Sequence, residues 1–147
     1  MSADSENATV LLIGASRGLG YAIAAEYIDR GSRVVATVCG PGRTALHDLQ
    51  QTAGGRLEIE HVDINAPEQI RALRERLGAR RFDLLFVNSG VTNRPEETTA
   101  DVTTEEFTRL MITNALSLMR VIETLADAQR GRTGLRYLDY LGQTVAW

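Results

Sequence analysis

Three glycines near the start of the chain have the spacing Gly-x-x-x-Gly-x-Gly. Gly14, Gly18 and Gly20 follow the apolar run 10–13 and precede a segment with helical spacing. In a strand–turn–helix of this kind, the first glycine allows a tight turn, and the second lets the backbone approach a pyrophosphate. The third lets the helix pack closely on the sheet. The free N–H groups at the helix start also favour phosphate. The loop therefore predicts a dinucleotide site; the alternative is a turn that merely requires glycine.

The residues after the second expected strand decide which dinucleotide fits. An acidic residue about 20 positions past the glycine loop usually holds the 2′-hydroxyl of the adenosine. Positions 34–42 contain no Asp or Glu, whereas Arg17 stands inside the glycine loop and Arg43 follows the strand. Guanidinium groups form forked, charge-assisted hydrogen bonds with phosphate oxygens. We therefore predict NADP in preference to NAD; the alternative is that both arginines are surface charges.

Apolar runs and segments with helical spacing alternate along the chain, and these elements must position the loop. We expect buried strands at Thr9–Ile13, Arg33–Val38, 57–62 and 82–87. We expect helices from Leu19 to a stop at Gly31, over 44–52, from Asn65 as cap and Pro67 to a stop at Gly78, and from Thr103 to about Ala128. This order predicts right-handed crossovers and an α/β fold, a Rossmann-type doubly wound parallel sheet in three αβα layers. The expected organisation is one domain over residues 1–147.

The last expected helix carries an amide on its apolar face. Thr103 and Glu106 predict a capping box at its start. The apolar face consists of Phe107, Leu110, Met111, Leu118, Val121, Ile122 and Leu125. Asn114 lies four residues from both Leu110 and Leu118, so we expect it to be buried. An unpartnered buried amide costs about 1–3 kcal/mol, so Asn114 must be hydrogen-bonded, either as a structural amide or as part of a site.

The composition limits the classes of partner. The 147 residues carry a net charge of −3, and 24% of them are charged. They show no interleaving of basic and aromatic residues, so we predict no nucleic-acid partner. No apolar run approaches the roughly 18 residues of a membrane span, and the polar residues 1–7 do not have a signal-peptide pattern. With Cys39 as the single cysteine, these features predict a cytoplasmic protein without a membrane partner.

Four segments, in order, resemble the short-chain dehydrogenase/reductase family. They are the cofactor-loop sequence Gly14-Ala15-Ser16-Arg17-Gly18-Leu19-Gly20, the adenine-contacting Asp63 with Ile64, the segment Asn88-Ser89-Gly90 after the fourth strand, and the catalytic asparagine at Asn114. The resemblance covers about residues 9–125. It implies that Ser16 and Leu19 also contact the cofactor, and that Asn114 kinks its helix and holds the water of a proton relay. The implied activity is hydride transfer between NADP(H) and a small-molecule carbonyl or alcohol.

The resemblance fails from about Asp127 onward. The family has a catalytic Ser after its fifth strand and a Tyr-x-x-x-Lys pair on the next helix, where the tyrosine acts as general acid or base. All 16 basic residues here are arginine, and neither Tyr137 nor Tyr140 is followed by a lysine four positions on. We therefore expect a truncated or altered C-terminal side with a divergent tail over 127–147. The alternative function is a catalytically inactive nucleotide-binding or interaction remnant.

Two further expectations concern partners and competing folds. Members of the family commonly pair through the helix that contains Asn114, and half of a doubly wound sheet leaves apolar surface on its edge and on this helix. We therefore expect a homo-oligomer such as a dimer. Another nucleotide-binding Rossmann protein, for example a methyltransferase, would need an acidic residue closing the second strand, and positions 34–42 hold none.

Overall fold

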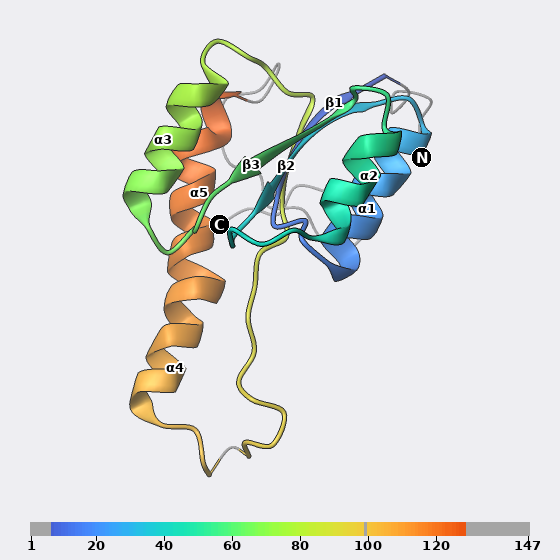
Figure 1. Cartoon of the computed structure of the whole chain (residues 1–147). Coiled ribbons are helices and arrows are strands. Elements are labelled where there is room, and N and C mark those ends of the chain that lie inside the picture. The colour runs from blue at the N-terminus through green and yellow to red at the C-terminus, as the bar shows by residue number, and fades with distance from the viewer. Residues whose placement is uncertain (1–6, 99, 129–147) are drawn as a thin grey trace, which may run out of the picture.

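The computed structural model describes residues 7–98 and 100–128 of the chain (Figure 1). The sequence pattern also predicts a loop over 129–134 and a weaker strand over 135–141, with Tyr137 and Tyr140. Both segments lie outside the described residues.

A four-stranded parallel sheet with the order β3-β2-β1-β4 forms the centre of the described part. The strands are β1 (Thr9–Ile13), β2 (Arg33–Val38), β3 (Leu57–His61) and β4 (Leu84–Val87). In the centre of β1, Leu11 lies opposite Val35 of β2 and Leu85 of β4. The chain runs outward from β1 to β3 and then returns to the other side of β1, which is the order of a doubly wound Rossmann-type sheet. The predicted fold class is confirmed.

Helices cover both faces of this sheet (Figure 1). The helices α1 (Gly18–Asp29) and α2 (Ala45–Thr52) lie on one face, and α3 (Pro67–Leu77) and α5 (Ser117–Leu125) lie on the other. Because side chains alternate along a strand, β1 supplies two cores. Val10 and Leu12 pack in the cluster that includes Ala24 of α1, whereas Leu11 and Ile13 pack with residues of α3 and α5. The three αβα layers follow directly from this alternation.

Several predicted boundaries differ from the observed ones by one or two residues, and two of them are informative. Ala66 takes the N-cap position of α3 in place of Asn65, whose amide bonds instead to two hydroxyls of a later helix. The strand β4 begins at Leu84, two residues later than predicted. Phe82 is nevertheless buried, and its N–H donates to the carbonyl of Ala128 at 2.8 Å. Tertiary contacts decide both boundaries.

The last predicted helix is divided by a π-helical turn. It consists of α4 (Thr104–Met111), the π-helical segment η2 (Ile112–Leu116), α5 and the short 3₁₀ turn η3 (Ala126–Ala128). Sequence periodicity does not reveal such a turn, which inserts one residue into the helical repeat. π turns occur frequently at functional sites.

Among the described residues, no helix combines the length and apolarity that crossing a membrane requires.

The first half of this helix is less buried than predicted. Phe107 and Met111 were expected in the core but are 59% and 49% exposed. Figure 1 shows the reason: α4 extends beyond the sheet, so no layer covers it. Thr103 accepts the N–H of Glu106 at 3.2 Å, as predicted. In the predicted capping box the Glu106 carboxylate would accept the backbone N–H of Thr103. It accepts instead from the Arg109 guanidinium at 2.7 Å.

Candidate functional site

The carboxyl ends of the four strands meet at one edge of the sheet, where they border a cavity of about 430 Å³. Ligands of open α/β sheets bind at this edge, near the point where the strand order reverses. In this chain that point lies between β1 and β4. The predicted site residues line the cavity, with the exception of Leu19, Gly20, Arg43 and Asn114. Residues separated by more than 70 positions in the sequence therefore form one site.

The loop after β1 is held from both sides by neighbouring strands. The Gly14 N–H donates to Thr37 Oγ1 of β2 at 2.9 Å. The Gly14 carbonyl accepts from Asn88 Nδ2, after β4, at 3.1 Å. Gly14 has φ +89°, and a Cβ there would lie 2.5 Å from Ser89 Oγ. Glycine is therefore required at this turn by both conformation and space.

The two later glycines meet different surroundings. Gly18 has φ +58°, and a Cβ there would have no neighbour within 4 Å, so its surface is open to the cavity. A Cβ on Gly20 would lie 2.0 Å from the Gly14 carbonyl oxygen and 2.7 Å from Asn88 Nδ2. Gly20 is buried. Gly18 thus leaves room for a ligand, whereas Gly20 allows α1 to pack against the loop.

The start of α1 is directed at the cavity without a competing side chain. Arg17 occupies the N-cap position but makes no capping hydrogen bond, and the first turn contains no acidic residue. Arg17 is exposed, and none of the described residues forms an ion pair with it. Leu19 is 65% exposed beside it. The positive end of the helix and a free guanidinium together favour an anion at this place.

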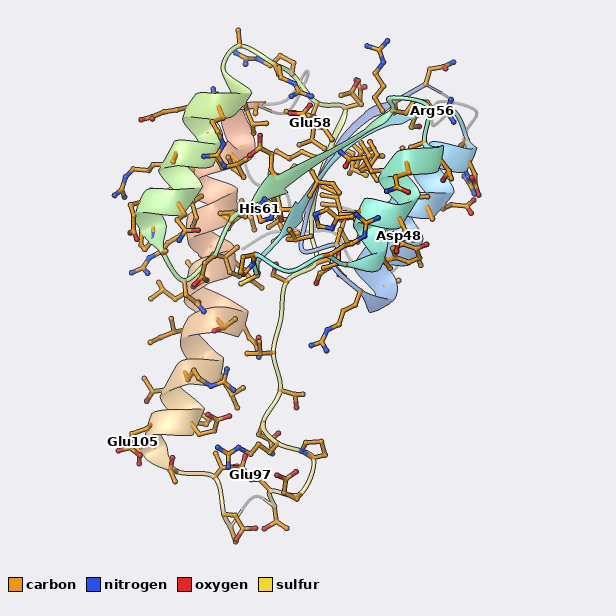
Figure 2. The ribbon with its side chains drawn as sticks, viewed as in Figure 1. Asp48, Arg56, Glu58, His61, Glu97 and Glu105 are labelled. Carbon is orange, nitrogen blue, oxygen red and sulfur yellow. The ribbon has the colours of Figure 1, made fainter. Side chains whose placement is uncertain are left out.

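Only one of the two arginines predicted to bind a 2′-phosphate, Arg17, lines the cavity. Arg43 does not line the cavity; its guanidinium forms an exposed ion pair with Asp48 in the first turn of α2, which Figure 2 labels. Cys39, directly after β2, does line the cavity. Burial and the nearby Asp63 carboxylate raise the pKa of the Cys39 thiol above its usual value. The thiol therefore stays protonated and uncharged at neutral pH.

Asp63 follows β3 and is fixed within its own loop. Its N–H donates to Gln69 Oε1 at 2.9 Å, and its Oδ1 accepts from the Asn65 N–H at 2.9 Å. Ile64 beside it is 7% exposed and belongs to the core. One carboxylate oxygen of Asp63 is thus used by the loop, which leaves the other to accept a hydrogen bond from a ligand in the cavity.

Asn114 lies in the π-helical turn, and its prediction as a buried amide is wrong. The residue is exposed, because the π turn rotates it away from the inner face formed by Thr113 and Ser117. Both polar atoms of its amide nevertheless bind one backbone position. Oδ1 accepts the Val91 N–H at 2.8 Å, and Nδ2 donates to the Val91 carbonyl at 2.7 Å. The second N–H and the remaining lone pairs of the amide stay available beside the cavity.

Several residues that line the cavity, among them Thr37, Asn65 and Val91, are not predicted as site residues from the sequence. Thr37 holds the glycine loop, and its polarity within the apolar run 34–38 of β2 is a usable signal. The sequence predicts Asn65 only as a helix cap, because an asparagine just before a helix looks the same in the sequence whether it caps the helix or makes a tertiary contact. Val91 contributes backbone atoms alone, so no side-chain pattern could have identified it.

The family model for short chain dehydrogenase matches residues 8–135 of the chain. The match covers most of the sequence and all of the cavity described above. The chain therefore belongs to the short-chain dehydrogenase family.

Individual relatives agree with this assignment. The chain is 29% identical over 126 residues to 3-oxoacyl-acyl-carrier-protein reductase FabG of Escherichia coli K12, covering 84% of this chain and 50% of that protein. It is 57% identical to a Burkholderia multivorans protein assigned to the short-chain dehydrogenases/reductases and crystallised with NADP. That comparison has a TM-score of 0.79 and covers 84% of this chain and 54% of the other.

A carbonyl reductase from Pseudomonas aeruginosa PAO1 in complex with NADP is 33% identical, with a TM-score of 0.77. The match covers 83% of this chain and 56% of that one. The chain spans about half the length of the curated FabG relative it matches. These relatives support the fold and family over the described strands and helices.

Proposed function

We propose that these residues bind NADP(H) and belong to an oxidoreductase that transfers a hydride between NADP(H) and a carbonyl or alcohol substrate. The observation that carries the proposal is the edge of the sheet where Gly18, the uncapped start of α1 and the unpaired Arg17 face one cavity. Two structural relatives crystallised with NADP support the choice of cofactor.

The residues present fit the parts of such a nucleotide. The open surface over Gly18 and the N–H groups of α1 suit the pyrophosphate. Arg17 suits the adenosine 2′-phosphate, and Arg43 can join it if the exposed pair with Asp48 opens, which costs about 1 kcal/mol or less. Asp63 suits the adenine edge. When bound, NADPH would supply the hydride; the chain would hold and orient it.

Substituting Arg17 tests the choice between NADP and NAD. A charge-assisted contact to phosphate contributes about 1.5–3 kcal/mol when sheltered, so Arg17→Ala should weaken NADPH about tenfold at this exposed site and leave NADH nearly unchanged. The measurement is the fluorescence increase of each reduced nucleotide on binding. Arg56→Ala is the matched control, because Arg56 is an exposed arginine at the opposite end of the sheet (Figure 2). Equal losses for the two nucleotides in Arg17→Ala reject the 2′-phosphate assignment.

A second function is binding without turnover. The sequence contains no lysine, so its 147 residues hold no Tyr-x-x-x-Lys pair to protonate a carbonyl oxygen. The discriminating assay is NADPH oxidation against a panel of aldehydes and ketones. Turnover by the wild-type chain supports the oxidoreductase if Asn114→Ala abolishes it while NADPH binding persists. Binding of NADPH with no turnover across the panel supports the inactive nucleotide-binding function.

We further propose that the chain forms a homo-oligomer through an outer stripe on α4, η2 and α5. The stripe consists of Phe107, Met111, Ile112, Leu116 and Met119, all exposed. Figure 2 places Glu105 and Glu97 at the far end of α4, away from the sheet. Exposed apolar stripes of this kind favour association. Sedimentation at several concentrations tests this; a monomer throughout contradicts it.

We also propose a cytoplasmic location, supported by the single Cys39.

A further inference from the structure

One side chain joins the two halves of the cavity. The Asn65 amide, in the loop after β3, contacts two hydroxyls of the helix that carries Asn114. Asn65 Oδ1 accepts from Thr113 Oγ1 at 3.2 Å and from Ser117 Oγ at 2.8 Å, and Asn65 Nδ2 lies 3.1 Å from Thr113 Oγ1. Thr113 is 4% exposed and Ser117 is fully buried. The contact spans about 50 positions of sequence and fixes η2 from its inner side.

The same loop also holds Asp63. The Asn65 N–H donates to Asp63 Oδ1, so the backbone and the side chain of Asn65 face different partners. On the opposite side of η2, Asn114 holds both backbone atoms of Val91. A continuous series of hydrogen bonds therefore runs from the carboxylate after β3, through Asn65 and the π turn, to the backbone after β4.

The middle of this series is the π turn η2, whose hydrogen-bond spacing differs from that of the α-helices on either side. A π turn differs from an α-helix by one residue per turn, and η2 begins and ends within an otherwise α-helical segment. Thr113 and Ser117 reach the same amide oxygen from positions four apart, one inside η2 and one directly after it. A shift of the loop after β3 would therefore change the support of η2 and move Asn114 with it.

We propose that Asn65 is a positioning residue that couples occupation of the adenine half of the cavity to the placement of Asn114. The inference rests on the proposed function, because it requires a nucleotide beside Asp63. Binding at the Asp63 loop holds Asn65, Asn65 holds Thr113 and Ser117, and the fixed π turn keeps the Asn114 amide on Val91. Binding of the adenine half of the nucleotide thus fixes the part of the site that contains Asn114, where the substrate would react.

The test uses adenosine 2′,5′-bisphosphate, which contains the adenine half of NADP and lacks the nicotinamide. The reporter is hydrogen exchange of the Val91 amide, because that N–H is bonded to Asn114 Oδ1. At saturating ligand we expect exchange at Val91 to slow about fivefold in the wild-type chain, the lower end of typical coupling between sites. Binding is measured in parallel by calorimetry.

Two variants separate coupling from simple packing. The double variant Thr113→Val, Ser117→Ala removes both hydroxyls without touching the loop after β3, and it should bind the ligand while losing the slowing at Val91. Asn65→Asp keeps an oxygen that accepts both hydroxyls and should retain the slowing. Bound ligand without slowing in the wild type, or equal slowing in the double variant, overturns the coupling alone. Failure of the wild type to bind the ligand overturns the proposed function and the coupling together.

Discussion

Gly20 offers the sharpest test of how the loop and α1 fit together. In Gly20→Ala the new Cβ would lie 2.0 Å from the Gly14 carbonyl oxygen, 2.7 Å from Asn88 Nδ2 and 3.0 Å from Ala15 Cα. Two of these neighbours are backbone atoms, so no side-chain rotation relieves them. The start of α1 or the Gly14 peptide must therefore move by about 1 Å, and overpacking of this kind costs about 1–3 kcal/mol.

The displacement also affects hydrogen bonds that hold the loop. Gly14 donates to Thr37 Oγ1 and accepts from Asn88 Nδ2, and each such bond contributes about 1 kcal/mol. The better helix propensity of alanine offsets about 0.5–1 kcal/mol. The expected net loss is about 2–4 kcal/mol in the free energy of unfolding, which is a large part of a typical domain's stability.

Urea denaturation followed by circular dichroism measures this loss. Gly42→Ala is the matched control, since a Cβ at Gly42 meets nothing within 4 Å and its φ is not positive; it should change the unfolding free energy by about 0.5 kcal/mol or less. A Gly20→Ala chain as stable as the Gly42→Ala control would refute the close approach of α1 to the loop.

Three further predictions concern hydrogen bonds and ion pairs. Thr37→Val removes the acceptor of the Gly14 N–H and should lower the unfolding free energy by about 1–3 kcal/mol in urea, whereas Thr37→Ser should restore most of it; equal losses contradict this role. Asn88→Ala should cost about 1 kcal/mol or more and weaken NADPH binding, because Gly14 loses its second anchor; unchanged binding argues against that anchor. The Arg74 guanidinium holds the pKa of Asp127 below its ordinary range through two hydrogen bonds. The resulting stabilisation is present above about pH 4 and is lost as the pH falls through the lowered pKa. Asp127→Asn should therefore lower the unfolding free energy measured in urea at pH 7 by about 1 kcal/mol or less, and this loss should disappear near pH 2; a constant difference at both pH values contradicts the ion pair.

The parts of the fold that depend on local signals were predictable from the sequence. β1 and β2 match their predicted ranges residue for residue, because strands of a parallel sheet are apolar on both faces. The end of α1 is marked by Gly31, whose φ of +83° requires glycine. The glycine loop is also identifiable, since each of its three glycines has a different steric role.

The parts that depend on tertiary contacts were not predictable in the same way. The burial of Phe107 and Met111 was overestimated, because periodicity shows that a face is apolar but not whether another layer covers it. A regular 3.6-residue repeat puts Asn114 on the buried face, and η2 breaks that repeat. The pairing of Asn65 with Thr113 joins residues 48 positions apart, and a single sequence contains no signal for it.

The central claim is that the edge of the sheet around Gly18 and Arg17 is a site for NADP(H). Its most direct test is a calorimetric titration of the wild-type chain with NADPH and, separately, with NADH. We predict saturable one-to-one binding of NADPH, at least about tenfold tighter than that of NADH, since NADH lacks the 2′-phosphate. Absence of NADPH binding at concentrations up to about 1 mM, which corresponds to a binding free energy weaker than about −4 kcal/mol, would contradict it.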